Sequence, residues 1–272
     1  MRVISIFTND TAISRETKRQ LVSKLENSGF HTEDFFSEHS ELIICVGGDG
    51  AFLKAIHKCN FPATPFIGIN TGHLGFFQEI SPDELDIFIE NYKQGKYRLQ
   101  PLSTVKATVT ADGKTIEHVG LNEIVIKSSG SRSIHLNISI GGSFIERFSG
   151  DGILVATPAG STAYNYSLGG SIVDPRLNLL QVTPIAPINT TAYRSFTSSI
   201  LLPSDLSFGV IPECGREYSF ILVTDGIEYR YEKMEWIDIN FAKPVINLLR
   251  FESYDFWNKV KTKFLDDRVE IL

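Results

Sequence analysis

The chain has 272 residues, of which 42% are hydrophobic and 21% charged, and its formal net charge is −6. This length exceeds one typical domain of about 100–200 residues, so we expect two domains with a real core. The acidic balance and the lack of a basic tract in the sequence argue against a nucleic-acid-binding protein.

The cysteines and the apolar runs indicate the compartment. Cys45, Cys59 and Cys214 are odd in number and lack C-x-x-C spacing, which is typical of a reducing cytosol. The opening residues MRVISIF are too short for a signal peptide, and no segment approaches the ~18 apolar residues of a membrane span. We therefore expect a cytoplasmic protein with no membrane partner.

Residues 1–96 alternate short apolar strands with helical segments, which predicts a parallel sheet. The first elements expected are a strand over 3–7, a helix over 14–27, and strands over 42–46 and 66–69. A second helix is marked by Ser81 as N-cap, Pro82 at its first position and Glu84 completing a capping box, and Gly95 ends it.

The strand over 42–46 ends in Gly47-Gly48-Asp49-Gly50, and a helical segment over 51–57 follows. Glycines let the backbone approach a polyphosphate, and both the strand end and the helix start favour an anionic ligand. The motif can also be a plain tight turn, and it matches neither familiar phosphate loop. We expect Asp49 to face the reacting groups, while backbone amides and a metal carry the phosphate charge, because the motif has no lysine.

The pattern changes to period-two strands between residues 98 and 245, with hairpin signals at Asp112-Gly113 and Gly141-Gly142. Asp225-Gly226 is also predicted to be a hairpin turn, and the alternative is that it closes over a ligand. The tail over 251–265 mixes aromatic and charged residues, and we expect it to pack back onto the first domain. The predicted organisation is an α/β domain over 1–97 joined by the tail over 250–272, and a β-rich domain over 98–249.

A segment rich in hydroxyl groups, Thr157 to Ser167, follows a predicted strand in this second half. It offers short donors to a polar ligand, and Tyr164 could stack on a base; the alternative is a Ser/Thr-rich turn that caps a helix. Asn122-Glu123 interrupts an apolar strand, and a buried polar pair is costly unless a network or a ligand satisfies it.

Five motifs together resemble the bacterial NAD kinases over nearly the whole chain. They are GGDG at 47–50, TGHLGF at 71–76, Asn-Glu at 122–123, GDG at 150–152 and TPAGSTAY at 157–164. The resemblance implies an α/β domain followed by a β-sandwich, and transfer of the terminal phosphoryl of ATP or polyphosphate to the 2′-hydroxyl of NAD, which gives NADP. It also implies tetramers in which a neighbouring subunit completes part of the NAD site.

The same resemblance assigns the site residues. Asp49 is the expected proton acceptor beside the ribose, and Asp151 and Ala186 are expected toward the nicotinamide end. The full set of expected substrate-binding residues is Gly50, Phe76, Asn122, Glu123, Ser149, Asp151, Ala159, Thr162, Ala163, Tyr164, Asn165, Tyr166, Ser167 and Ala186. Ala51 and Ala159 stand where the family usually has a hydroxyl residue, which leaves the choice of donor open. Ser149 stands where some members have a basic residue, so one candidate partner for the product 2′-phosphate is absent.

A single carboxylate, Asp49, is enough for the expected phosphoryl transfer to a ribose hydroxyl. A ribose hydroxyl is a poor nucleophile, and a carboxylate that accepts its proton typically contributes ~10²–10⁴-fold, with most other acceleration from alignment and charge neutralisation. Mg²⁺ is therefore expected on the donor phosphates, where it neutralises charge. No His, Cys or carboxylate cluster in the sequence has metal-ligand spacing, so we expect the ion to arrive with ATP and to keep several waters.

Two other functions stay open at this point. A diacylglycerol-type lipid kinase would share the GGDG turn but needs an apolar entrance, which the hydroxyl-rich segment disfavours. A non-catalytic NAD or NADP sensor is disfavoured by the intact Asp49.

Overall fold

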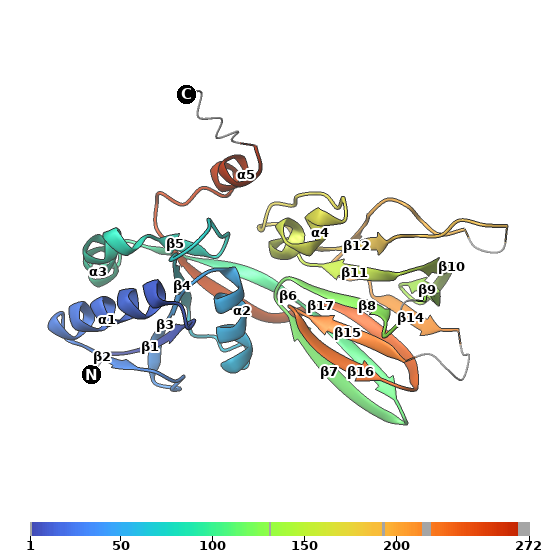
Figure 1. Ribbon diagram of the computed structural model, residues 1–272, viewed down its shortest axis with the longest axis horizontal. Helices are drawn as coiled ribbons and strands as arrows, with labels where there is room; N and C mark the ends of the chain where they lie inside the picture. Colours follow the sequence, from blue (N-terminus) through green and yellow to red (C-terminus); the bar gives the residue numbers. More distant parts are fainter. Residues whose placement is uncertain (1, 131, 192–193, 214–218, 266–272) are drawn as a thin grey trace. The chain divides into compact units, whose positions relative to one another are not determined.

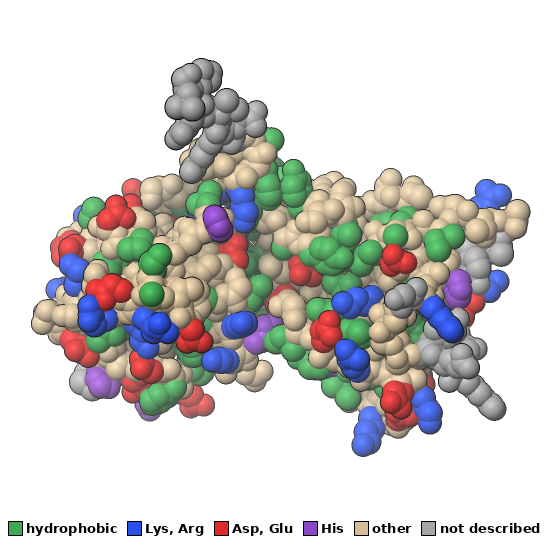
Figure 2. All heavy atoms as spheres, in the orientation of Figure 1, with side chains coloured by type: hydrophobic (Ala, Val, Ile, Leu, Met, Phe, Trp, Pro, Cys, Tyr) green, Lys and Arg blue, Asp and Glu red, His purple; other side chains and the backbone are tan. Residues whose placement is uncertain are grey.

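The computed structural model describes residues 2–130, 132–191, 194–213 and 219–265 (Figure 1). It forms two compact units, Met1–Pro101 with Ile246–Leu272, and Leu102–Val245. Cys214 lies outside the described residues. None of the helices within those residues is long and apolar enough to cross a membrane. On the face drawn in Figure 2, acidic and basic side chains are interspersed.

The first unit is built on a parallel sheet. Its strands are β1 (Arg2–Thr8), β2 (Phe30–Glu33), β3 (Ser40–Val46), β4 (Phe66–Ile69), β5 (Gln78–Ile80) and the end of β17 (Met234–Arg250). The order is β17-β4-β3-β1-β2, and β5 also pairs with β4. Residues 42–46 of β3 are all buried, as expected for a parallel strand covered on both faces. The prediction of a parallel sheet is confirmed, although the short, polar β2 and β5 were not foreseen.

Three helices cover this sheet: α1 (Ala12–Asn27), α2 (Asp49–Lys58) and α3 (Leu85–Lys93), the last preceded by a 3-10 turn, η1 (Pro82–Glu84). Thr11 caps α1 by accepting a hydrogen bond from the Ser14 N–H, and the predicted Ser81–Glu84 capping box is present. Leu21 of α1 and Phe88 of α3 pack in one core with Ile44 and Ile67. The sequence pattern therefore located α1 and α3 correctly.

The tail returns to the first unit, as predicted. It ends in α5 (Phe256–Phe264), which begins at the N-cap Asp255. The Phe256 and Phe264 rings each lie 5.8 Å from the Phe76 ring. Burial of these aromatic surfaces explains why a segment so distant in sequence from Phe76 packs beside it.

The second unit is an antiparallel β-sandwich, which confirms the expected fold class. One sheet contains β6 (Arg98–Ala111), β7 (Lys114–Gly120), β9 (Ile134–Ile140), β10 (Ser143–Gly150), β14 (Phe208–Pro212) and most of β17. The other sheet has the order β13 (Ile200–Pro203), β12 (Leu179–Ile185), β11 (Gly152–Ala156), β8 (Glu123–Ser128), β15 (Phe220–Thr224) and β16 (Ile227–Tyr231). Fully buried side chains from both sheets, among them Ile126, Phe148, Val155 and Phe208, form the core between them.

Hairpins lie where the sequence predicted them. Asp112 and Gly113 join β6 to β7 with positive φ angles of 49° and 69°, and Asp225 and Gly226 join β15 to β16 with φ angles of 49° and 87°. Two consecutive positive φ angles match the twist of the flanking antiparallel strands. A short 3-10 turn, η2 (Ala159–Thr162), and one helical turn, α4 (Tyr164–Ser167), follow β11.

Candidate active site

Asp49 is a residue of the first turn of α2, rather than of a turn before it. The helix was expected to begin at Ala51 and in fact begins at Asp49, with Gly48 as its N-cap. Gly47 makes this start possible, because its φ is +149° and a Cβ there would lie 2.7 Å from the Ala51 Cβ. The unpaired N–H groups of the first turn favour the negative charge of Asp49.

The Asp49 carboxylate is held by a loop that precedes β5. It accepts hydrogen bonds from the backbone N–H groups of Phe76 (3.0 Å) and Phe77 (3.1 Å). A Cβ on Gly75 would lie 2.4 Å from the Asp49 Oδ1, so the loop can approach only because this residue is glycine. The Asp49 side chain nevertheless keeps 27% of its surface exposed, which leaves it accessible to a reactant.

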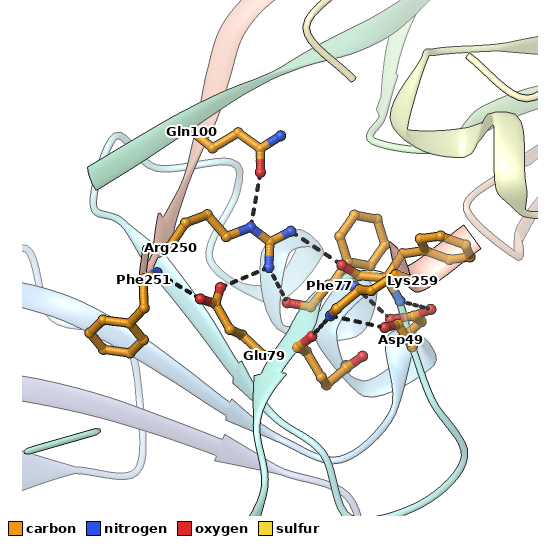
Figure 3. A network of polar contacts seen from close by, with 10 residues as sticks. Asp49, Phe77, Glu79, Gln100, Arg250, Phe251 and Lys259 are labelled. Carbon is orange, nitrogen blue, oxygen red and sulfur yellow. Dashed lines mark hydrogen bonds and ion pairs between the residues drawn. The ribbon is translucent and has the colours of Figure 1, made fainter. Parts of the chain in front are cut away.

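Three cations from the C-terminal segment, Arg250, Lys259 and Lys263, lie near this loop, and the sequence analysis did not identify them. Figure 3 shows Arg250 and Lys259 beside it. Arg250, at the end of β17, donates to the carbonyl oxygens of Phe76 and Phe77, both at 3.2 Å. Lys259 of α5 donates to the carbonyl oxygens of Gly75 (3.3 Å) and Gln78. The Lys263 Nζ lies 3.9 Å from the Asp49 Oδ2. The expectation of an anion site without a nearby lysine is therefore incomplete. The spacing of Lys259 and Lys263 by four residues places both on one face of α5, but it does not indicate which loop that face approaches.

Glu123 is the first residue of β8 and Asn122 directly precedes the strand, so the pair does not interrupt it as the sequence suggested. The Asp225 carboxylate accepts hydrogen bonds from the backbone N–H groups of Leu121 (2.7 Å), Asn122 (2.8 Å) and Glu123 (3.2 Å). The Asn122 Oδ1 and the Glu123 Oε2 are buried without a hydrogen-bond partner. Because buried polar atoms are normally satisfied, these two oxygens point to a ligand. Asp225 was read from sequence mainly as a turn residue, so its supporting role was missed.

The burial of Glu123 raises the pKa of its carboxyl to about 8, and the nearby charge of Asp225 adds to the shift. The ordinary value is 4.5, so between these two pH values the folded chain holds a proton that the unfolded chain releases. The protonated Glu123 carboxyl is therefore the form that the folded state favours. Its contribution to the free energy of unfolding is fully present below pH 4.5 and is lost as the pH rises through about 8.

We expect Glu123→Gln to flatten this dependence. The wild type should lose on the order of a few kcal/mol of stability between about pH 5 and about pH 8 that the variant does not lose. Urea unfolding at a series of pH values measures the difference. Glu117→Gln, at an exposed side chain of β7, is the control and should follow the wild type. Parallel pH curves for wild type and Glu123→Gln would show that Glu123 does not hold the proton.

The hydroxyl-rich segment packs directly on Asn122. The Thr157 hydroxyl donates to the Leu121 carbonyl oxygen at 2.6 Å, and the Thr157 N–H donates to the Asn122 carbonyl oxygen at 2.9 Å. A Cβ on Gly160 would lie 2.0 Å from that same Asn122 oxygen. The structure thus brings together two motifs that are 35 residues apart in the sequence.

Side chains in this segment divide into two groups. Ser161 and Asn165 are fully buried. The Ser161 hydroxyl donates to the Pro158 carbonyl oxygen and accepts from the Val173 N–H, and the Asn165 amide donates to the carbonyl oxygens of Ser161 and Ser171. Tyr164 and Tyr166 are 46% and 39% exposed. Buried polar groups therefore hold the turn, and the binding role of the exposed Tyr164 stays a prediction.

The remaining expected residues of the second unit lie as follows. Ser149 and Asp151 flank the end of β10, and the Asp151 N–H donates to the Ile185 carbonyl oxygen at 2.9 Å. Next to it, Ala186 has a φ of +44°, an unfavourable angle for a residue with a Cβ, and such strain clusters at functional sites. Ala159, Thr162, Ala163 and Ser167 belong to or adjoin η2 and α4. Asp49, Gly50 and Phe76 belong to the first unit.

Metal-binding capacity is low among the residues that the structure describes, where no three His, Cys, Asp or Glu side chains form a group able to hold an ion. Cys45 and Cys59 are buried free thiols, and burial raises the pKa of both. Thiols that are buried and protonated are inert, so neither is a candidate nucleophile.

Comparison with known proteins identifies the family. Residues 5–97 match the ATP-NAD kinase N-terminal domain, and residues 121–246 match the ATP-NAD kinase C-terminal domain. The chain is 40% identical over 271 residues to an NAD kinase of Finegoldia magna, covering 97% of this chain and 98% of the relative. It is 34% identical over 273 residues to an NAD kinase of Latilactobacillus sakei, covering 98% of this chain and 99% of the relative.

Solved structures share the fold. A yeast NADH kinase complexed with NADH superposes with a TM-score of 0.84 at 20% identity, covering 100% of this chain and 89% of the other. An NAD kinase from Archaeoglobus fulgidus in complex with ATP superposes with a TM-score of 0.76 at 23% identity, covering 96% of this chain and 99% of the other. The resemblance inferred from the five motifs is thus confirmed: the chain belongs to the NAD kinase family, the kinases that act on the 2′-hydroxyl of NAD.

Proposed function

We propose that this chain transfers the terminal phosphoryl of ATP to the 2′-hydroxyl of the adenosine ribose of NAD, with Asp49 as the proton acceptor. The observation that carries the proposal is the position of Asp49 in a family-matching motif, bound by the Phe76 and Phe77 amides yet accessible. Those two hydrogen bonds fix the orientation of the carboxylate, and proton acceptance depends on that orientation.

The second unit supplies the dinucleotide-binding groups in this proposal. The unsatisfied oxygens of Asn122 and Glu123 can accept hydrogen bonds from ligand hydroxyl or amino groups. Tyr164 offers an exposed ring for stacking on adenine. The strained backbone at Ala186, beside Asp151, supports a role for this corner at the nicotinamide end.

A divalent metal, Mg²⁺, is proposed to accompany the donor phosphates. The described residues lack a ready-made carboxylate or imidazole cage, and Mg²⁺ usually keeps several waters and binds mainly through substrate phosphates. Bound there, the ion would neutralise charge on the transferred group. Polyphosphate remains an alternative donor in the proposal.

One coupled assay tests this function. Purified protein is incubated with NAD or NADH, Mg²⁺ and either ATP or polyphosphate, and the formation of NADP or NADPH is measured. Product that depends on ATP supports the proposal, and the ratio between substrates gives the selectivity. No NADP under any of these conditions would contradict it.

Binding measurements separate the two alternative functions. A ligand at 100 times its dissociation constant stabilises a protein by ~2.7 kcal/mol, so NAD and NADP should raise the melting temperature. A shift with a diacylglycerol instead would favour the lipid kinase, and a shift with NAD but no turnover would favour the sensor.

Tyr164→Ala is expected to weaken NAD binding by about 1–3 kcal/mol, because the base loses its stacking partner. Calorimetric titration with NAD measures the change as a roughly 5- to 150-fold rise in Kd. Tyr164→Phe keeps the ring and serves as the control, with near-normal affinity. Equal affinity in wild type and Tyr164→Ala would exclude the stacking role.

A cytoplasmic homo-oligomer, a tetramer by family resemblance, completes the proposal. Buried free thiols at Cys45 and Cys59 are compatible with a reducing compartment. Three apolar side chains on β10, β14 and β17 of one sheet are exposed, namely Phe144 (64%), Ile211 (53%) and Trp236 (41%), and exposed apolar side chains favour association. Light scattering of the purified protein gives the number of chains.

A further inference from the structure

The two peptide groups that hold Asp49 are each bound at both ends. In the Gly75–Phe76 peptide, the N–H donates to Asp49 and the carbonyl oxygen accepts from the Lys259 Nζ at 3.3 Å. In the Phe76–Phe77 peptide, the N–H donates to Asp49 and the carbonyl oxygen accepts from the Arg250 Nη2 at 3.2 Å. Each peptide dipole therefore lies between a cation and the carboxylate (Figure 3).

Both cations are anchored by further contacts. Arg250, whose side chain is 3% exposed, also donates to the Gln100 Oε1 at 2.9 Å and to the Glu79 Oε2 at 3.2 Å. Lys259 donates to the Gln78 carbonyl oxygen as well. Since hydrogen bonds to charged donors are strong and polarise one another in a buried site, these cations should stiffen the loop.

We propose that Lys259 and Arg250 are positioning residues for Asp49, which bind the far ends of the two peptide groups whose N–H groups orient its carboxylate. The inference deepens the proposed role of Asp49 and rests on it. Neither cation contacts the carboxylate directly, so each acts through the loop over 75–78. Displacement of a catalytic group by about 1 Å can cost ~10²-fold in rate, which makes such support consequential.

Lys259 gives the sharper test because its charge is sensitive to its surroundings. The groups around it are Arg250 of β17, Glu79 of β5, Asp49 of α2 and Lys263 of α5, with the Tyr254 ring 5.3 Å from its Nζ. Burial, with a contribution from Arg250, lowers the pKa of Lys259 to about 8. An arginine in its place stays charged at every pH of interest.

The experiment measures kcat and KM for NAD with saturating MgATP from about pH 6.5 to about pH 9.5. Lys259→Met is expected to lower kcat ~10-fold or more while KM changes less than about threefold, because orientation and not binding is lost. Lys259→Arg should restore kcat and should retain it above pH 8, where the wild type declines. Lys261→Met, at an exposed lysine of the same helix, is the matched control.

Two kinetic outcomes would overturn the inference. One is a wild-type kcat in Lys259→Met. The other is an equal loss of kcat in Lys259→Met and Lys259→Arg, since a restored cation should restore the loop.

A second measurement does not depend on activity. Amide hydrogen exchange at Phe76 and Phe77 should be faster in Lys259→Met than in Lys261→Met, because the two N–H groups lose part of their constraint. Equal exchange rates in these variants would contradict the inference. If the wild type forms no NADP, the proposed function fails while this exchange result still decides the structural claim.

Discussion

Asp49→Asn is expected to reduce kcat by on the order of 10²-fold or more, while the Kd for NAD stays near that of the wild type. The amide keeps the size of the side chain but cannot accept the proton of the ribose hydroxyl. One of its two polar atoms also becomes a donor, so it cannot accept hydrogen bonds from both Phe76 and Phe77 as the carboxylate does. Steady-state kinetics with NAD and MgATP, together with calorimetric titration, separates turnover from binding.

A suitable control is Asp86→Asn. This exposed carboxylate of α3 pairs with Lys24 at 2.6 Å, and loss of a surface ion pair should leave turnover within about twofold. Turnover of Asp49→Asn close to that of the control would remove Asp49 from the mechanism. Loss of turnover with an equal loss of NAD affinity would assign it to binding.

Gly160→Ala is expected to have the largest effect in the second unit. The new Cβ would meet the Asn122 carbonyl oxygen at 2.0 Å and its carbonyl carbon at 2.4 Å, and neither backbone atom can move without breaking the Thr157 N–H bond to that oxygen. Forced expansion of a packed site typically costs about 1–3 kcal/mol or more. We expect a lower melting temperature and a rise of at least ~10-fold in the Kd for NAD.

Gly130→Ala provides the comparison, because a Cβ at this glycine of the same unit meets open space. Its stability should stay within about 0.5 kcal/mol of the wild type. Thermal unfolding and NAD titration of both variants are sufficient. If Gly160→Ala binds NAD as tightly as Gly130→Ala, the packing of the 157–167 segment on Asn122 does not shape the binding site.

Local patterns were enough to predict most of the fold. The capping box at Ser81 and the hairpin dipeptides at Asp112 and Asp225 carry their geometry within a few residues, so a single sequence reveals them. The start of α2 was placed two residues late, because Asp49 was read as a turn residue and it in fact occupies the first helical turn. Strand β5 was missed because Gln78-Glu79-Ile80 lacks a hydrophobic period.

The site was predicted less completely, and the reason is distance along the chain. Asp49, Asn122 and Tyr164 belong to short motifs that can be recognised from the sequence alone. Arg250 lies 174 residues from Phe76 and Lys259 lies 184 residues from Gly75, whose carbonyl groups they bind, and no periodicity connects positions so far apart. Asp225 supports Asn122 across a separation of 103 residues. Such partners are specified by the tertiary fold alone.

The discontinuous first unit has a consequence for synthesis. Its sheet gains the Leu248–Phe66 pairing, and its Asp49 loop gains Arg250 and Lys259, only from residues near the end of the chain. A ribosome releases these residues well after residues 2–101, which therefore emerge without the segment that completes their sheet and loop. We expect the nascent chain to populate a partly ordered state until residues 246–265 have also emerged, with the sandwich free to fold earlier.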